Sequence, residues 1–297
     1  MPKALGRFSD FLFYSNIFLA FSVTSLVFET SVVLNAGMPD LRYPFFLFFS
    51  TLFLYSFHRI FRFNFRAERE KLADRHIWVK NNRSLFYTIL FLSGACSAIS
   101  AILFIPLRVL FSLLPVAFVS FAYTIPCVPW KGKLIRLRDV PGLKIFLISL
   151  VLGLTTVLLP VLACTSASNL FDTPVLFVFF RRMFFIFAIT IPFDIRDSEY
   201  DRKNNVQTLP VVFGERASRR MALAGLGVFA LLVLLQLLFV TSTRMSYAIA
   251  LLLSAAISAR MIVHSEKTKR DLYYSFNLEG MMLLQCILVA AAYTYAQ

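Results

Sequence analysis

The chain has 297 residues, of which 59% are hydrophobic and 15% are Asp, Glu, Lys or Arg, and its formal net charge is +14. A typical soluble domain has about 25% charged residues, because its surface must be solvated. The composition therefore excludes a soluble enzyme, a disordered chain and a small disulfide scaffold, and it predicts an all-α polytopic membrane protein. The four cysteines are widely spaced and form no C-x-x-C pair, so they indicate neither a metal site nor a redox motif.

Nine apolar segments are long enough to cross a hydrocarbon core of about 30 Å, which needs about 20 apolar residues per helix. In chain order, the expected spans are 12–35, 43–63, 84–104, 106–125, 142–164, 174–194, 219–241, 245–263 and 277–296. The N-terminal segment has no secretory signal pattern and is expected to be a retained first span. Residues 1–297 are therefore interpreted as a single membrane-embedded domain.

The distribution of positive charge predicts the orientation. Nearly all Lys and Arg residues outside the spans lie at the N-terminus and in the loops after spans 2, 4, 6 and 8, whereas the opposite loops carry only Arg42, Arg108 and Arg244. Cytoplasmic loops carry the excess of Lys and Arg, so the N-terminus is expected to be cytoplasmic. We expect an integral protein of a bacterial inner (plasma) membrane. Because the bias toward cytoplasmic Lys and Arg accounts for most of the positive charge, we expect no nucleic-acid partner.

Three carboxylates follow the sixth span. Asp194, Asp197 and Asp201 are spaced three and four residues apart, so a helix would place them on one face. Ionised carboxylates at a membrane boundary repel each other and are costly to desolvate, and a divalent cation removes that cost. Mg²⁺ prefers a few carboxylates together with water and phosphate oxygens, and Arg196 and Lys203 could contact the same phosphates. The alternative is a solvated helix end of mixed charge.

The sequence around these carboxylates resembles a known family motif. Asp194-Ile-Arg-Asp197, then Asp201 and Thr208-Leu-Pro-Val-Val-Phe-Gly214, closely resemble the second aspartate-rich motif of the UbiA superfamily of intramembrane prenyltransferases. The resemblance implies a UbiA-like bundle of nine transmembrane helices whose active site opens at the cytoplasmic side. It also implies that Asp194, Asp197 and Asp201 are catalytic residues that bind Mg²⁺.

The segment from Tyr123-Thr-Ile-Pro126 through Lys131-Gly-Lys133, followed by Asp139-Val-Pro-Gly-Leu-Lys144, also resembles that family's loop after the fourth span. In the family's corresponding loop, a Tyr and basic residues help to hold a diphosphate, which implies this role for Tyr123, Lys131 and Lys133. The implied reaction is Mg²⁺-assisted transfer of an isoprenyl group from an allylic isoprenyl diphosphate to an acceptor that the sequence does not identify. Cationic groups stabilise the leaving diphosphate, and a dry interior protects the allylic cation from water.

The chain departs from the family where its first motif, N-x-x-x-D-x-x-x-D, is expected. The second span, 43–63, contains no acidic residue. Three accounts compete: Arg59 and Arg62 bind the diphosphate directly in place of one metal ion, the later residues Glu68, Glu70 and Asp74 supply the ligands, or the fold is kept without transferase activity. The third account predicts an inactive UbiA-fold membrane protein that binds an isoprenoid, a quinone or a partner.

Several titratable residues lie inside the expected spans. His58 beside Arg59 is either an interfacial packing residue or a group that contacts phosphate or deprotonates the acceptor. Charged residues are costly within a membrane and usually face a cavity or each other, so Glu29 and Arg59 are expected to form a pair. Arg181 and Arg182 are expected either to extend to the outer interface or to border the substrate chamber.

Overall fold

The computed structural model describes residues 3–34, 39–64, 74–130, 132–163, 170–204, 206–241, 243–265 and 271–295. The long helices are α2 (Ile17–Val33), α3 (Arg42–Asn64), α5 (Arg83–Phe104), α6 (Leu107–Ala122), α7 (Leu143–Ala163), α8 (Thr173–Lys203), α10 (Glu215–Phe239), α11 (Met245–His264) and α13 (Gly280–Tyr295). Shorter helices are α1 (Lys3–Tyr14), α4 (Asp74–Asn81), α9 (Leu209–Phe213) and α12 (Asp271–Tyr273). A small antiparallel hairpin pairs β1 (Val128–Trp130) with β2 (Lys133–Ile135).

The helices are suited to an apolar solvent. Among the described residues, seven helices are long and apolar enough to cross a membrane, and the bent pair formed by α1 and α2 makes eight. Helix α6 is apolar but shorter. Large apolar side chains are exposed on α5 and α6, among them Phe91, Ile102, Phe111 and Phe118. Such a contiguous apolar exterior is costly in water and favourable in lipid, so the all-helical membrane class predicted from composition is confirmed.

The first expected span is bent rather than straight. Residues Phe8–Tyr14 and Ile17–Val33 meet at an angle of 59°. Asn16, at the break, has a φ of 68°, which is in the left-handed region that Asn tolerates better than most residues. Its side-chain amide donates to the Ser56 hydroxyl at 3.4 Å, and this contact ties the bend to α3.

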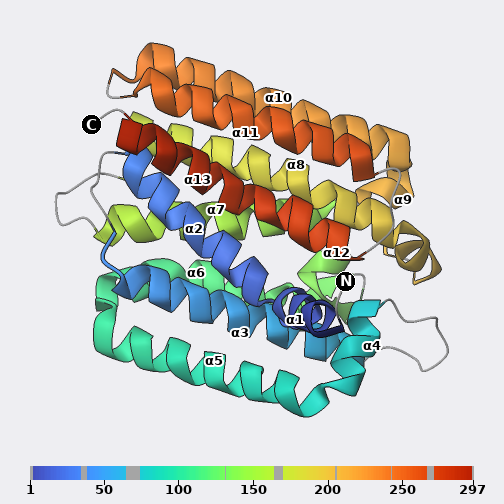
Figure 1. Ribbon diagram of the computed structural model, residues 1–297. Helices are drawn as coiled ribbons and strands as arrows, with labels where there is room; N and C mark the ends of the chain where they lie inside the picture. The colour runs from blue at the N-terminus through green and yellow to red at the C-terminus, as the bar shows by residue number, and fades with distance from the viewer. Residues whose placement is uncertain are drawn as a thin grey trace.

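Helix α8 lies in the interior of the bundle, where it packs against α7 and α10 (Figure 1). It continues to Lys203, well beyond the expected end of the sixth span, so residues 194–203 are helical rather than a loop. Helices α10 and α11 form one edge of the assembly and α5 the other, with α2, α7 and α13 between them (Figure 1). The carboxylate motif is thus carried on a helix that is supported on both sides.

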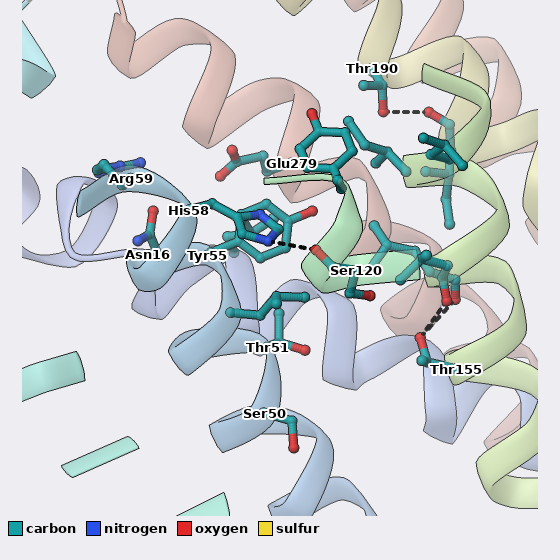
Figure 2. Close-up of a pocket in the computed structure, with 18 of the residues that line it drawn as sticks. Asn16, Ser50, Thr51, Tyr55, His58, Arg59, Ser120, Thr155, Thr190 and Glu279 are labelled. Carbon is teal, nitrogen blue, oxygen red and sulfur yellow. Dashed lines mark hydrogen bonds between the residues drawn. The ribbon is translucent and has the colours of Figure 1, made fainter. Parts of the chain in front are cut away.

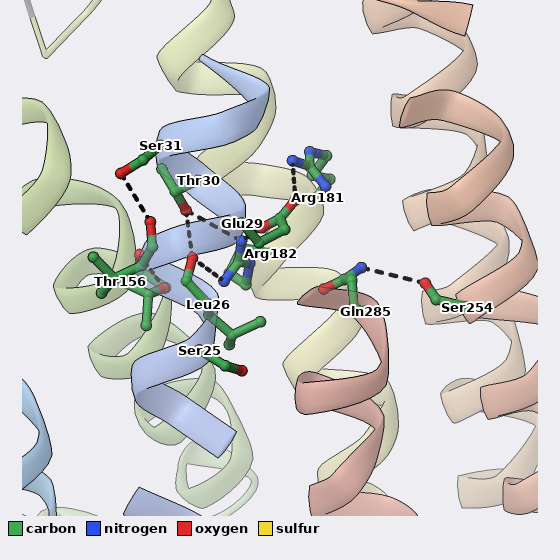
Figure 3. Close-up of polar contacts among 12 residues, drawn as sticks. Ser25, Leu26, Glu29, Thr30, Ser31, Thr156, Arg181, Arg182, Ser254 and Gln285 are labelled. Atoms are coloured by element: carbon green, nitrogen blue, oxygen red, sulfur yellow. Dashed lines mark hydrogen bonds and ion pairs between the residues drawn. The ribbon is translucent and has the colours of Figure 1, made fainter. Parts of the chain in front are cut away.

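A cluster of three charged residues lies in the middle of the bundle (Figure 3). The side chains of Glu29, Arg181 and Arg182 are completely buried. Arg181 Nη2 lies 2.7 Å from Glu29 Oε1, and Arg182 Nη2 contacts Glu29 Oε2. Arg182 also donates to the Leu26 carbonyl at 3.3 Å and to the Thr30 hydroxyl at 3.2 Å. These contacts join α2 to α8 far from any solvent.

Two predictions about the charged side chains inside the expected spans are therefore wrong. Glu29 pairs with Arg181 and Arg182 rather than with Arg59, because α8, not α3, presents cations at its level. Arg181 and Arg182 are buried rather than extended to an interface, and neither lines the cavity described below. Arg59 instead donates to the Tyr14 carbonyl, at the end of α1, and lies 5.9 Å from the ring centre of Phe86.

Replacing Glu29 with Gln is expected to destabilise the bundle by about 3–5 kcal/mol, because two buried guanidinium groups lose their counterion. The exposed pair of Asp40 and Arg42 provides the control, since their side chains are 40% and 56% exposed. Asp40→Asn is expected to cost less than about 1 kcal/mol. Unfolding followed in detergent measures both changes, and equal effects of the two variants would contradict the structural role of Glu29.

Candidate functional site

The three carboxylates of the sequence motif share one face of α8, as their spacing predicts. Asp194 and Asp201 are almost fully buried, with 2% and 1% of their surfaces exposed. The side chain of Asp197, between them, is 14% exposed and faces a cavity in the bundle. Three acidic groups on one buried face require positive partners, since a buried carboxylate without one is strongly disfavoured.

Lys144 provides the partner for two of these carboxylates. Its Nζ atom lies 2.5 Å from Asp194 Oδ1 and 3.6 Å from Asp201 Oδ2. The lysine side chain is only 10% exposed and lies in the first turn of α7, opposite the carboxylate face of α8. The sequence placed Lys144 at the end of the segment that resembles the family's loop after the fourth span, but it did not predict this ion pair.

Arg196 is held between two carboxylates and two aromatic rings. Its Nε lies 3.0 Å from Asp197 Oδ1, and its Nη1 lies 3.1 Å from Asp271 Oδ1. The guanidinium carbon lies 5.3 Å from the ring centre of Phe193 and 4.8 Å from that of Tyr274. Asp271 and Tyr274 begin the last span, and the sequence gave no indication that they approach the motif.

Tyr123 lies between His58 and Arg138 on the opposite side of the site. Its ring centre is 5.3 Å from that of His58, with the planes at 30°, and 5.1 Å from the Arg138 guanidinium carbon. The Nε2 atom of His58 is 3.2 Å from the Ser120 carbonyl oxygen, so this nitrogen carries the proton that it donates. Tyr123 thus lines the same cavity as Asp194 and Asp197, within a stack that its motif did not predict.

Arg138 adds a permanent positive charge beside the carboxylates. It follows the β1–β2 hairpin and is 9% exposed. Its burial alone would lower the pKa of the guanidinium. The neighbouring Tyr123, Asp139, Asp201 and Asp194 more than offset this, so the pKa of Arg138 is raised above its ordinary value. The group therefore stays charged at any physiological pH.

Most of these residues line one end of a cavity of about 530 Å³, but Asp201 and Tyr274 are not part of its lining. The charged end is lined by Arg59, Arg138, Lys144, Asp194, Arg196, Asp197 and Asp271. The remainder is largely apolar and is lined by residues that include Leu113, Leu147, Leu152, Leu159 and Ile186. Along α7 the lining extends from Lys144 to Leu159, about 22 Å at a rise of 1.5 Å per residue. The cavity can hold an elongated apolar molecule with an anionic head.

Polar groups that the motifs do not include also line the cavity. Glu279 ends a π-helical turn, Tyr274–Glu279, which precedes α13. Figure 2 shows Glu279, Tyr55 and His58 on one side of the cavity, with Thr155 and Thr190 on the other. π-Helical turns within α-helices are frequently found at functional sites. The only sequence signal for Glu279 was an acidic residue inside the expected last span, 277–296.

The other predicted site residues are placed differently or lie outside the described part of the chain. Lys133 in β2 and Lys203 at the end of α8 are exposed and do not line the cavity. Lys131, the side chain of Arg62, and the acidic residues Glu68, Glu70 and Asp74, proposed as alternative ligands, fall outside the residues and side chains that the structure describes.

The carboxylates fit a magnesium ion that is shared with a ligand. Within the described ranges, no group of three or more His, Cys, Asp or Glu side chains converges to hold a metal ion. Mg²⁺ usually takes only one or two carboxylates, with water and substrate phosphates completing its shell. Oδ2 of Asp194 and Oδ2 of Asp201 are buried with no hydrogen-bond partner in the described structure, although the Lys144 ammonium lies 3.6 Å from the latter. Both oxygens could accept such an ion in place of that ammonium.

Comparison with known proteins supports a common fold. A model of the UbiA prenyltransferase family matches residues 79–281. The apo structure of a UbiA homologue from Aeropyrum pernix K1 is similar at a TM-score of 0.64 and 16% identity, over 93% of this chain and 98% of that one. A UbiA homologue from Archaeoglobus fulgidus bound to DMAPP and Mg²⁺ is similar at a TM-score of 0.64 and 13% identity, over 97% and 98%.

A third structure, from work on digeranylgeranylglyceryl phosphate synthase in membranes, has a TM-score of 0.57 and 16% identity over 96% of each chain. No curated protein sequence matches the chain. At these identities the likeness to solved structures concerns the fold.

Replacing Arg138 with Met is expected to weaken the binding of inorganic pyrophosphate by about tenfold or more, since a hydrogen bond to a charged group contributes about 1.5–3 kcal/mol. Isothermal titration of the protein in nanodiscs measures this change. Arg136→Met is the matched control, because Arg136 pairs with Asp139 at 2.7 Å and does not line the cavity. Unchanged affinity in Arg138→Met would contradict the assignment of this end of the cavity to an anion.

Proposed function

Because the chain belongs to the UbiA prenyltransferase family, we propose that it transfers an isoprenyl group from an allylic isoprenyl diphosphate to an acceptor within the membrane. The observation that carries the proposal is the elongated cavity with a charged end and an apolar body. The fold is shared with a homologue whose structure contains DMAPP and Mg²⁺, an isoprenyl diphosphate with a divalent cation.

The charged end is proposed to bind the diphosphate. Arg59, Arg138 and Arg196 line it, and Tyr123 lies between His58 and Arg138. Arg62, Lys131, Lys133 and Lys203 are proposed as further diphosphate contacts on the strength of the sequence alone. When the allylic C–O bond breaks, its electron pair leaves with the diphosphate, and fixed cations stabilise the charge that develops there.

Asp194, Asp197 and Asp201 are the proposed catalytic carboxylates and would hold magnesium. When bound, Mg²⁺ neutralises charge on the leaving diphosphate. Asp197 faces the cavity directly and also pairs with Arg196. This one side chain would therefore orient both the guanidinium group of Arg196 and the metal ion. The second span supplies no carboxylate, so Arg59, on α3, contributes a positive charge to the cavity where the family has an acidic motif.

The apolar body is proposed to hold the isoprenoid chain and to exclude water from the allylic cation. Aromatic faces border the charged end, including those of Phe193, Phe121 and Tyr55, and such faces attract cations. The acceptor then forms the new bond with its own electron pair and loses a proton. In neutral His58, the hydrogen bond from Nε2 to the Ser120 carbonyl keeps the ring proton on Nε2, so Nδ1 is the nitrogen that can accept the proton from the acceptor.

The proposed topology has nine crossings, with the bent pair of α1 and α2 counted as one crossing and the short helix α6 as another. The N-terminus and the loops around the site are placed in the cytoplasm by the excess of Lys and Arg. The proposed location is a bacterial inner membrane, in which the charged end of the cavity opens toward the cytoplasm and the apolar body lies at the level of the lipid.

A non-catalytic role is the second candidate. It is favoured by the absence of carboxylates from the second span and by the lysine that already neutralises Asp194 and Asp201. Such a protein would bind an isoprenoid, a quinone or a partner in the same cavity without breaking a C–O bond.

Asp194→Asn combined with Asp197→Asn is expected to lower the rate of pyrophosphate release from isoprenyl diphosphates by at least about a hundredfold, since preorganised charge at a leaving group contributes on this scale. The assay supplies Mg²⁺ and an aromatic acceptor, and it measures released pyrophosphate. Glu199→Gln is the control, because Glu199 is an exposed acid on the same helix. An unchanged rate in the double variant would rule out the proposed transfer chemistry.

Thr155→Phe is expected to shorten the longest isoprenyl chain that the protein accepts, because the added ring would fill the body of the cavity. The Thr155 hydroxyl donates to the Val151 carbonyl of its own helix at 2.9 Å, so its loss breaks no contact between helices. Competition between diphosphates of increasing length measures the change, with Thr155→Val as the control of similar shape. Equal loss of short and long chains would argue against this path for the chain.

A further inference from the structure

We infer that Lys144 is a built-in counterion that occupies Asp194 and Asp201 while the cavity is empty, so that a divalent cation enters only together with a diphosphate. The inference rests on the diphosphate site of the proposed function, but it does not depend on transfer of the isoprenyl group. It concerns how the charge of the site is balanced before any substrate is bound.

The backbone holds Lys144 in place against the carboxylate face. Gly142, just before α7, has a φ of 71°, a conformation that favours glycine, and its N–H donates to the Gln207 carbonyl at 3.1 Å. The adjacent Val206 N–H donates to the carbonyl of Asp201 at 2.9 Å. The segment that leaves the carboxylate helix therefore also fixes the start of the helix that carries the lysine.

The lysine provides charge that a metal ion would otherwise provide. Its ammonium group contacts both Asp194 and Asp201, and no more than 10% of any of the three side chains is exposed. Attraction between buried charges is stronger than in water, and removing one partner of a buried pair is strongly unfavourable. A metal ion arriving alone would have to displace this ammonium.

A bare metal ion that displaced the ammonium would obtain few protein ligands in return. Mg²⁺ gives up its water reluctantly and needs six oxygen ligands in nearly octahedral geometry. Lys144 contacts two carboxylates, the third carboxylate of the motif, Asp197, lies 3.0 Å from Arg196 Nε, and the second span contains no acidic residue. Without a diphosphate, Lys144 therefore stabilises Asp194 and Asp201 better than a bare metal ion would.

A diphosphate changes this balance in two ways. Its oxygens would add ligands for the metal ion to those that Asp194 and Asp201 supply. It also gives the displaced ammonium a new anionic partner within the same cavity, which Lys144 lines together with Asp194 and Asp197. Metal and diphosphate are thus expected to bind as one unit, and neither carboxylate is left without a cation at any stage.

Equilibrium dialysis against Mn²⁺, which takes the same oxygen ligands as Mg²⁺, tests the inference in full-length protein in nanodiscs. The wild-type protein is expected to retain Mn²⁺ only when inorganic pyrophosphate is present. Lys144→Met is expected to bind Mn²⁺ without pyrophosphate at least about tenfold more tightly than the wild type, because the competing charge is gone. Adding Asp194→Asn to Lys144→Met should remove this gain.

Lys80→Met is the matched control, because Lys80 is an exposed lysine of α4, and it should bind metal like the wild type. Wild-type retention of Mn²⁺ without pyrophosphate that disappears in Asp194→Asn would overturn the inference, and this measurement needs no lysine variant to fold. Absence of retention even with pyrophosphate would overturn joint entry together with the diphosphate site itself, whereas loss of prenyl transfer alone would affect only the proposed function.

Discussion

Charge neutralisation inside an apolar bundle is the constraint on which the rest of this structure depends. Helix α8 carries charged residues at two levels, and each level is matched by a partner from another helix. In the middle of the bundle, Arg181 and Arg182 pair with Glu29 of α2. At the cavity, Asp194 and Asp201 pair with Lys144 of α7. The same contacts that make the charges tolerable also fix α2 and α7 against α8, and so they define the walls of the cavity.

This arrangement explains how the chain can lack acidic residues in its second span and still present a charged cavity. A site built from two sets of carboxylates needs metal ions to be neutral, whereas this one already contains its cations. Lys144, Arg138 and Arg196 each contact or adjoin a carboxylate, and Arg59 lines the cavity from α3. The lack of acidic residues in the second span therefore changes the source of positive charge in the cavity and does not remove that charge.

The sequence predicted the features that depend on local spacing. Apolar segments predicted the helical membrane class, and the three- and four-residue intervals placed Asp194, Asp197 and Asp201 on one face of a helix. The ion pairs were not predictable in this way, since Lys144 and Asp194 are 50 residues apart, and Glu29 and Arg181 are 152 apart. The pairing of Glu29 with Arg59 was a reasonable expectation from adjacent spans, but tertiary packing brings α8 to Glu29 instead.

The central claim is that this cavity binds an isoprenyl diphosphate and ionises it. The most direct measurement incubates purified wild-type protein in nanodiscs with Mg²⁺, an aromatic acceptor and a series of isoprenyl diphosphates, and follows released pyrophosphate. The account predicts catalytic release for at least one chain length, with the isoprenyl group recovered on the acceptor. Tight binding of these diphosphates without release at any chain length would contradict it and would identify the protein as a binding member of its family.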